Sequence, residues 1–377
     1  MKFLLVSMPS IHVIRWIENL KDTDIELYWF DVLGKGELIT DAKLNQITNW
    51  KKRKLPYFKG EYWLSKNMPG FYKKLQPFLE ETSSNAFKKV ISKIQPDIVH
   101  SFEMQSCSYP IFEAMEANPN IKWIYSCWGS DLFYYTNIKF HKNKINQILN
   151  RVNYLITDCN RDYEIAKNNG FKGSFLGVIP GGTGFKMNQL KERFSVKERK
   201  IILVKGYEHK FGRGLNSIKA LHKLETELSN YEVVVFGAHN TVIDYIKNNN
   251  LPYVVYDRHG LSHSDILTIM GKSLLYIGNS ISDGMPNTLL EAIVMGAFPI
   301  QSNPGKVTEE IIEHKKNGLL IDNPEDINEI KNLISFALEN KEMIDNAITM
   351  NQMFANDHLD FFENQQKIIN LYKKLEK

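Results

Sequence analysis

Two carboxylates in the C-terminal half of the chain flank the predicted start of a helix. Asp283 begins the loop 283–286, and Glu291 lies about one turn into the helix that follows. Free backbone N–H groups at a helix N-terminus, with the positive end of the helix dipole, bind anions such as a diphosphate. Glu291 can then accept hydrogen bonds from ribose hydroxyls, and Asp283 from a sugar beyond the phosphates. A nucleotide sugar has these three parts in this order; the alternative is a surface turn with a solvated Asp and an ordinary helical Glu.

The elements predicted around these carboxylates are a strand, a loop, a helix and a second strand. The apolar run 274–277 is typical of a buried strand, and a helix is expected over 289–295, ending at Gly296. Asn287 or Thr288 can cap this helix. The unit therefore places the carboxylates after the carboxyl end of a strand.

The same alternation of strands and helices extends over the whole chain. Strands are expected at residues 3–7, 25–31, 97–100, 122–126 and 154–157, and again at 201–204, 231–236, 253–256, 274–277, 298–301 and 318–321. Short connections between such elements predict parallel sheets covered by helices. We expect an N-terminal Rossmann-like domain (1–180), a linker (181–199), a C-terminal Rossmann-like domain (200–355) and a C-terminal helix (356–377) that packs back on the N-terminal domain.

Composition limits the class of protein. A chain of 377 residues with 43% hydrophobic and 24% charged residues is typical of a soluble protein of two domains. The net charge of +4 is too small to indicate nucleic acid as a partner. Three widely spaced cysteines predict reduced thiols in the cytoplasm and exclude a disulfide framework. The N-terminal apolar run is too short for a signal peptide or a membrane span, so any membrane contact is expected to be peripheral.

The carboxylate-bearing stretch resembles the pattern E-G-x-P-x-x-x-L-E-A-x-A-x-G-x-P-V of the family 4 retaining glycosyltransferases, which have the GT-B fold. The matching residues are Asp283, in place of the first Glu, with Gly284, Pro286, Leu290, Glu291, Ala292, Gly296 and Pro299. Glu309 or Glu310 and the run N-G-L-L-I at 317–321 are similar to the end of the family pattern. The order of elements from residue 1 onward also agrees, so the resemblance extends over most of the chain.

The resemblance implies two Rossmann-like domains whose parallel sheets face an interdomain cleft, with the acceptor domain first and the donor domain second. It implies a metal-independent site without a cofactor. The implied residues are Asp283, Arg213, Lys205 and Asp131 for catalysis; Glu291, Gly284, Met285, Pro286, Asn287, Thr288, Leu289 and Gly237 for the donor; and His12, His100, Trp128 and Gly129 for the acceptor side. Arg213 and Lys205 are expected to stabilise the charge that develops on the diphosphate.

Three departures from the family pattern concern the site. Trp128-Gly129-Ser130-Asp131 replaces the usual H-G-x-D, so the His at the reacting sugar is absent. Tyr207 follows Gly206 where the family has Arg, and Arg213 precedes Gly214 where it has Lys. The Gly-Gly pair after the first strand is missing. His12 and His100 are expected to face the cleft, although a structural His is the commoner outcome.

The segment 51–74 combines eight basic residues and one acidic residue with six aromatic ones. Such a segment suits an anionic bilayer surface, where a lipid-linked acceptor resides. The alternative is a solvated loop and helix whose aromatic side chains are core.

The sequence thus predicts a cytoplasmic, peripherally membrane-associated glycosyltransferase of bacterial surface polysaccharide synthesis. Its expected donor is a UDP-sugar, or else a GDP-sugar, and its expected acceptor is a glycan or a lipid-linked glycan. A GT-B sugar-nucleotide 2-epimerase and a nucleotide-sugar-binding protein without transfer activity remain as alternatives.

Overall fold

A computed structural model describes residues 1–179, 184–190 and 194–375 of the chain. It divides into two compact units. Unit 1 comprises Met1–Thr157, Tyr163–Val178 and Ile368–Lys377, and unit 2 comprises Asp158–Asp162 and Ile179–Lys367. The predicted linker 181–199 falls partly on residues 181–183 and 191–193, which lie outside the described residues.

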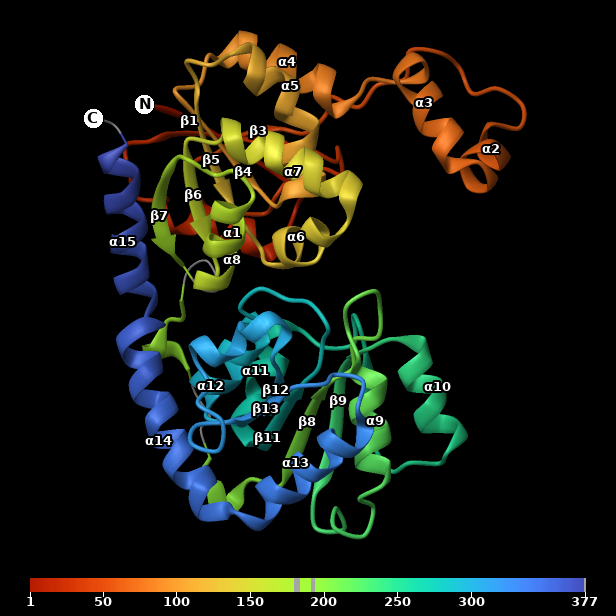
Figure 1. The fold of residues 1–377 in the computed structure, drawn as a ribbon, viewed down its shortest axis with the longest axis vertical. Coiled ribbons are helices and arrows are strands. Elements are labelled where there is room, and N and C mark those ends of the chain that lie inside the picture. Colours follow the sequence, from red (N-terminus) through yellow and green to blue (C-terminus); the bar gives the residue numbers. More distant parts are fainter. Residues whose placement is uncertain (180–183, 191–193, 376–377) are drawn as a thin grey trace. The chain divides into compact units, whose positions relative to one another are not determined.

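Unit 1 contains a seven-stranded sheet in the order β3-β2-β1-β4-β5-β6-β7, and all its neighbours pair in parallel (Figure 1). The strands are β1 (Lys2–Ser7), β2 (Glu26–Asp31), β3 (Asn45–Ile47), β4 (Ile98–Phe102), β5 (Lys122–Ser126), β6 (Tyr154–Thr157) and β7 (Ser174–Val178). Because the strands are parallel, their carboxyl ends meet at one edge of the sheet, where ligands of such folds bind.

Side chains alternate between two buried faces of this sheet. Leu4 and Val6 pack in a core with α4 (Ser83–Ile94), α5 (Tyr109–Ala117) and α7 (Lys139–Arg151). On the other face, Phe3 contacts Tyr372 of α15 (Phe361–Lys374), and Phe102 contacts Trp16 of α1 (Ile11–Asn19). Unit 1 also contains α2 (Glu61–Asn67), α3 (Pro69–Leu79), α6 (Ser130–Phe133) and most of α8 (Asn160–Asn168). The first three residues of α8 belong to unit 2.

Unit 2 contains a six-stranded parallel sheet in the order β10-β9-β8-β11-β12-β13. The strands are β8 (Ile201–Lys205), β9 (Glu232–Ala238), β10 (Val254–Asp257), β11 (Ser273–Gly278), β12 (Phe298–Ser302) and β13 (Leu319–Ile321). One face packs on α9 (Gly214–His222), α10 (Asn240–Asn248) and α13 (Ile327–Glu339), and the other on α11 (His263–Lys272) and α12 (Asn287–Met295). The long helix α14 (Lys341–His358) contributes to both cores.

The expectation of two parallel α/β sheets is confirmed. Two strands were missed: β3 contains no run of β-branched residues, and β7 shortly precedes the predicted linker, where no strand was expected. The three cysteines are buried, and none forms a disulfide within the described residues.

Candidate active site

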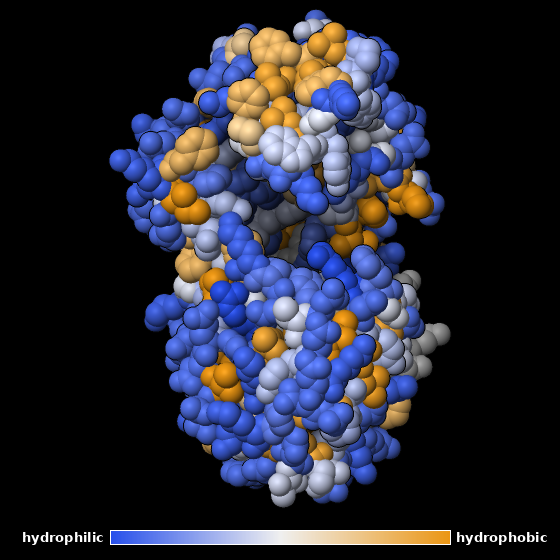
Figure 2. Space-filling view, turned by 90° about the vertical axis from the view of Figure 1, so that its right-hand side faces the viewer, coloured by the Kyte–Doolittle hydropathy of each residue, from blue (hydrophilic) through white to orange (hydrophobic). Residues whose placement is uncertain are grey.

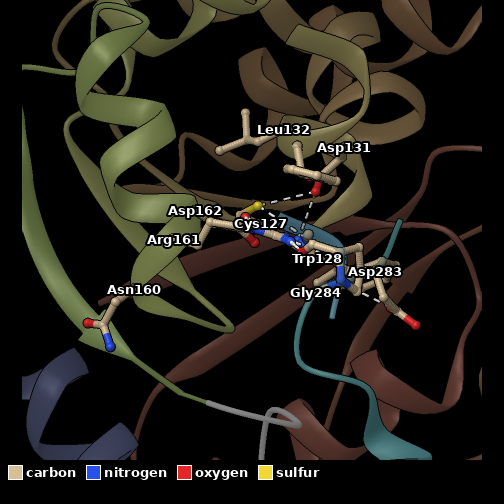
Figure 3. Close-up of polar contacts among 12 residues, drawn as sticks. Cys127, Trp128, Asp131, Leu132, Asn160, Arg161, Asp162, Asp283 and Gly284 are labelled. Atoms are coloured by element: carbon tan, nitrogen blue, oxygen red, sulfur yellow. Dashed lines mark hydrogen bonds and ion pairs between the residues drawn. The ribbon is translucent and has the colours of Figure 1, made fainter. Parts of the chain in front are cut away.

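Asp283 lies in the loop that connects β11 to α12 in unit 2. Its Oδ1 accepts a hydrogen bond of 3.0 Å from the backbone N–H of Gly284 (Figure 3). Burial raises the pKa of Asp283, while Lys205, the Gly284 N–H and Arg161 oppose that rise. Lys205, Arg161 and the Gly284 N–H therefore offset only part of the cost of burying this carboxylate.

Arg161 fixes the backbone of the same loop. Its Nη2 donates to the carbonyl oxygen of Asp283 (2.7 Å) and its Nη1 to that of Pro304 (2.6 Å), and Asp162 forms an ion pair with it at 2.8 Å. The Glu310 carboxylate in turn accepts from the backbone N–H groups of Asn160 and Arg161, at 2.8 and 2.9 Å. The position of Asp283 thus depends on a segment that is more than 100 residues away in the sequence.

The N-terminus of α12 differs from the expectation that Asn287 or Thr288 caps it. Pro286 is the N-cap residue and Asn287 begins the helix, with no side chain of the described residues capping it. The Thr288 hydroxyl instead accepts from the Tyr276 hydroxyl (2.8 Å) and from Lys205 Nζ (3.3 Å). The predicted end of the helix at Gly296 is confirmed by its left-handed φ of 77°.

Lys205 is thereby held at the start of α12. It ends β8, and its Nζ also lies 4.7 Å from the centroid of the Tyr207 ring. A lysine ammonium beside uncapped helical N–H groups forms a binding site for an anion. The structure brings together Lys205, Thr288 and Asp283, three of the residues that we predicted for the site.

Further basic side chains follow the neighbouring strands of the sheet. The Arg258 guanidinium, after β10, lies 5.7 Å from the Tyr207 ring, and His239, after β9, stacks on that ring at 5.9 Å. Burial lowers the pKa of His209, and the nearby charges of His239, Lys205, Arg258 and Arg213 lower it further. These side chains come from the loops after β8, β9 and β10, and the parallel sheet brings these three loops to the same edge.

Arg213, the residue that we expected to replace the family Lys, is the N-cap residue of α9. Its Nε donates to Glu325 at 3.0 Å, and its Nη1 donates to the carbonyl oxygens of His209 (3.2 Å) and Gly212 (2.9 Å). The guanidinium therefore holds together the loop after β8, and its positive charge is paired with the Glu325 carboxylate.

Gly237 lies in β9 beside the Tyr207 ring. Its φ is +62°, and a Cβ built on it would lie 2.3 Å from a carbon of that ring. Only glycine combines this conformation with so close an approach. Gly237 thus determines where the Tyr207 ring, and the cations packed on it, are positioned.

Glu291 is almost completely buried, at 4% exposure, on the second turn of α12. Its Oε1 lies 2.7 Å from Nε2 of His263, the first residue of α11. The imidazole of His263 thus fixes the Glu291 carboxylate about one turn from the N-terminus of α12.

Asp131 in unit 1 is buried and accepts four hydrogen bonds. They come from the backbone N–H groups of Met104 and Trp128 (both 3.0 Å), the Tyr125 hydroxyl (2.5 Å) and the Cys127 thiol (3.2 Å). Figure 3 shows the carboxylate directed toward Cys127 and the Trp128 backbone. Asp131 therefore fixes the Trp128-Gly129 turn that follows β5. Gly129 has a φ of +94° in this turn, a conformation that favours glycine.

The sequence did not identify Glu103, which directly follows β4. Its φ is +68°, which is rare for a residue with a Cβ, and its carboxylate accepts from the backbone N–H groups of Gln105 (3.0 Å) and Ser106 (2.5 Å). Burial, together with the charge of Asp131, raises the pKa of Glu103 to about 7. A carboxyl group that titrates near neutrality thus lies at the carboxyl edge of this sheet.

The two predicted histidines of unit 1 have different environments. The His12 ring lies 5.4 Å from the Trp128 ring and is partly exposed. His100 is fully buried, with Nδ1 2.5 Å from the Tyr372 hydroxyl and Nε2 2.7 Å from the Ser126 hydroxyl. Burial lowers the pKa of His100 to about 3, so it is a neutral structural residue and its expected place on the acceptor side is corrected.

Within residues 1–179, 184–190 and 194–375, no three His, Cys, Asp or Glu side chains converge as metal ligands do. No helix in the described parts of the chain has the length and apolarity to cross a membrane.

Two family models match the chain. That of the glycosyl transferases group 1 matches residues 187–354, and that of the glycosyl transferase 4-like proteins matches residues 3–159. The chain belongs to the family 4 glycosyltransferases. A search of curated protein sequences gave no match.

Solved structures show the GT-B fold of this glycosyltransferase. Sucrose-phosphate synthase from Thermosynechococcus elongatus aligns with a TM-score of 0.73 and 14% identity, over 100% of this chain and 99% of that one. Alr3699/HepE from Anabaena, in complex with UDP and glucose, aligns with a TM-score of 0.70 and 16% identity, over 99% and 100%. The pneumococcal O-GlcNAc transferase GtfA, in complex with UDP and GlcNAc, aligns with a TM-score of 0.62 and 15% identity, over 78% and 60%.

Three of the residues that the sequence analysis of this glycosyltransferase missed share one signal. Glu103, His239 and Arg258 each directly follow a parallel strand. Polar residues at such positions can be selected once the strands are predicted, whereas Arg161 and His263 show no pattern beyond their residue type.

Proposed function

We propose that this glycosyltransferase moves a sugar, with retention of configuration, from a nucleoside diphosphate sugar to a glycan or lipid-linked acceptor in bacterial surface polysaccharide synthesis. A UDP-sugar is the first donor to test, since Alr3699/HepE and GtfA have the same fold and their structures contain UDP. A GDP-sugar is the second. The enzyme acts in the cytoplasm, at the inner face of the membrane that carries a lipid-linked acceptor.

The observation that carries this proposal is the group of side chains at the α12 N-terminus. Lys205 is held there by Thr288, no side chain of the described residues caps the helix, and Glu291 lies about one turn further on. The diphosphate binds to the N–H groups and to Lys205, and the buried carboxylate of Glu291 accepts from ribose hydroxyls. Asp283 accepts from hydroxyls of the transferred sugar, and the backbone of the 284–289 segment contacts the donor.

The chemistry requires charge stabilisation more than a protein nucleophile. As the bond from the sugar to the diphosphate breaks, negative charge develops on the leaving phosphate oxygens. Lys205, Arg258 and the helical N–H groups stabilise this charge most strongly in the transition state. Arg213 contributes by keeping the loop after β8 closed and by its own charge, and Gly237 positions the Tyr207 ring beneath these cations.

His12, Trp128 and Gly129 form the acceptor side in this proposal. Asp131 fixes the Trp128-Gly129 turn through the Trp128 N–H, and the adjacent His12 ring supplies the imidazole that the usual family motif carries at position 128.

Incubation with radiolabelled UDP- and GDP-sugars tests the proposed function. Release of the nucleoside diphosphate together with a glycosylated acceptor supports transfer, and the anomeric configuration of the product tests retention. An isomerised donor would show a 2-epimerase instead. Tight binding without turnover, with every acceptor class supplied, would show a binding protein.

A further inference from the structure

Residues 51–80 of unit 1 form an arm that projects from the helices covering the sheet (Figure 1). Its two ends are joined by an antiparallel bridge between Arg53 and Glu80, and backbone N–H groups of Lys54 and Glu81 donate to Leu79 and Lys52. The helices α2 and α3 lie between these ends and pack on each other. The arm is thus an ordered hairpin of two short helices.

The centre of this arm is polar. Glu61 is 3% exposed, and its two carboxylate oxygens accept from Arg53 Nη1 (2.7 Å) and Nη2 (2.9 Å). The Tyr72 hydroxyl donates to the same carboxylate at 2.8 Å. The hydrogen bonds from Arg53 and Tyr72 lower the pKa of Glu61, so the ion pair is charged at neutral pH.

The apolar side chains of the arm are on its outside. Tyr62 is 78% exposed, Trp63 60% and Phe78 72%. The other exposed large side chains of the arm are Leu55, Tyr57, Phe58, Met68 and Phe71. Figure 2, which views the molecule from the side of α2 and α3, shows hydrophobic side chains gathered in its upper part beside hydrophilic ones. This arrangement excludes the interpretation of these aromatic side chains as core.

Positive charge accompanies the exposed aromatic side chains. Seven lysines are distributed over the arm at positions 51, 52, 54, 59, 66, 73 and 74, and all are exposed. Glu61 is the only acidic residue between positions 51 and 79, and it is neutralised by Arg53. The surface of the arm is therefore apolar and strongly basic.

We propose that this arm is the element that binds an anionic lipid bilayer, with its aromatic side chains in the headgroup layer and its lysines on lipid phosphates. Amphipathic rings and lysines with long apolar stems favour the interface between water and lipid. Protein interfaces are depleted in lysine, so the seven lysines favour a membrane over a protein partner. The inference rests on the proposed function only in that the lipid-linked acceptor lies in such a bilayer.

Vesicle flotation of the full chain tests this inference, using phosphatidylcholine alone or mixed with phosphatidylglycerol. We expect the protein to float with the mixed vesicles only, and to be released by high salt because screening weakens the lysine contacts. Replacing Tyr62→Ser and Trp63→Ser together, or Lys66→Gln with Lys73→Gln, should each lower the vesicle-bound fraction by about tenfold.

The matched control combines Phe140→Ser with Lys139→Gln, an exposed aromatic residue and an exposed lysine on α7. The inference is overturned if the protein stays with the soluble fraction, if the control lowers flotation as much as the arm variants, or if the arm variants instead abolish a dimer seen by sedimentation. Turnover of the donor sugar in vesicle-free solution is measured on the same samples. If the unsubstituted protein does not float but turns over the donor sugar, the membrane role alone is refuted. If it floats with the mixed vesicles but does not turn over the donor, the transferase proposal alone is refuted.

Discussion

Glu291 and Asp283 have unequal surroundings, although the sequence pattern presents them as a pair. Glu291 is buried and bonded to His263, whereas Asp283 is only partly buried and its charge is stabilised by Lys205. A buried, oriented carboxylate loses little freedom when it binds a ribose. We therefore assign the more specific donor contact to Glu291.

Replacing Glu291→Ala removes this acceptor and leaves His263 without the carboxylate. Hydrogen bonds to a charged group contribute about 1.5–3 kcal/mol, so the Kd for the nucleoside diphosphate should rise by about 10- to 100-fold. Isothermal titration calorimetry with UDP and GDP measures it. Glu342→Ala, an exposed carboxylate on α14, is the control, and an unchanged Kd in Glu291→Ala would remove Glu291 from the donor site.

Glu103 makes the stability of unit 1 depend on pH. Its pKa is raised to about 7 by burial and by Asp131, so the folded protein binds a proton that the unfolded chain releases above pH 4.5. Stability should therefore fall as pH rises from about 5 to 7, by on the order of 1–3 kcal/mol. In Glu103→Gln this decline should become smaller, and the remainder comes from Asp131, whose pKa burial also raises. Thermal unfolding of unit 1 at pH 5, 6, 7 and 8 measures it, and an equal slope in both proteins would contradict the assignment.

The sequence identified several residues of the candidate site and missed others. Lys205 ends a strand, Asp283 lies in the loop before a helix, and Glu291 lies on that helix. Short sequence patterns predict all three of these elements. The His263 contact to Glu291 and the Arg161 contact to Asp283 join segments that are distant in the chain, and no local pattern encodes them.

At the scale of elements, buried runs with short connections predicted most strands of both sheets. The α12 N-terminus was misjudged because Pro286 takes the N-cap position and Thr288 is used by Tyr276 and Lys205. Tertiary contacts thus overrode the local preference of Asn and Thr for caps. The outward aromatic side chains of the 51–80 arm could not be distinguished from core by sequence, because a helix of 7 residues shows too few turns to establish a face.

The close contact between β9 and the loop after β8 gives a prediction at this scale. Gly237→Ala forces a Cβ against the Tyr207 ring and strains a φ of +62°, so unit 2 should lose about 2–4 kcal/mol. In a Tyr207→Ala background the steric part disappears, and Gly237→Ala should cost only about 1 kcal/mol. Denaturant unfolding of the four proteins gives this cycle, and equal costs in both backgrounds would show that the contact is unimportant.

At the scale of the whole molecule, the C-terminal residues complete unit 1. Residues 368–377 belong to it, although most of the chain between residues 179 and 367 forms unit 2. The sequence predicted a C-terminal helix, 356–377, that packs back on the N-terminal domain. In unit 1, Lys122 Nζ donates to the carbonyl oxygen of Leu375 (3.2 Å), and the buried Tyr372 hydroxyl forms hydrogen bonds with Trp16 and His100.

The Tyr372 hydroxyl links α15 to α1 and β4 by hydrogen bonds, and through His100 to β5. Trp16 Nε1 donates to its hydroxyl at 2.9 Å, the hydroxyl lies 2.5 Å from His100 Nδ1, and His100 Nε2 lies 2.7 Å from the Ser126 hydroxyl. Because burial keeps His100 neutral through its lowered pKa, the hydroxyl donates to Nδ1 and Nε2–H donates to Ser126. One hydroxyl therefore satisfies both a buried donor and a buried acceptor.

Tyr372→Phe should leave Trp16 Nε1 and His100 Nδ1 unsatisfied and destabilise unit 1 by about 2–4 kcal/mol, since each buried group without a partner costs about 1–3 kcal/mol. Tyr253→Phe in unit 2 is the matched control, because the buried Tyr253 hydroxyl has no partner among the described residues. Its removal should leave stability unchanged or slightly higher. Differential scanning calorimetry distinguishes the two, and similar shifts in Tm for both variants would show that the Tyr372 hydroxyl does not hold the C-terminal helix in unit 1.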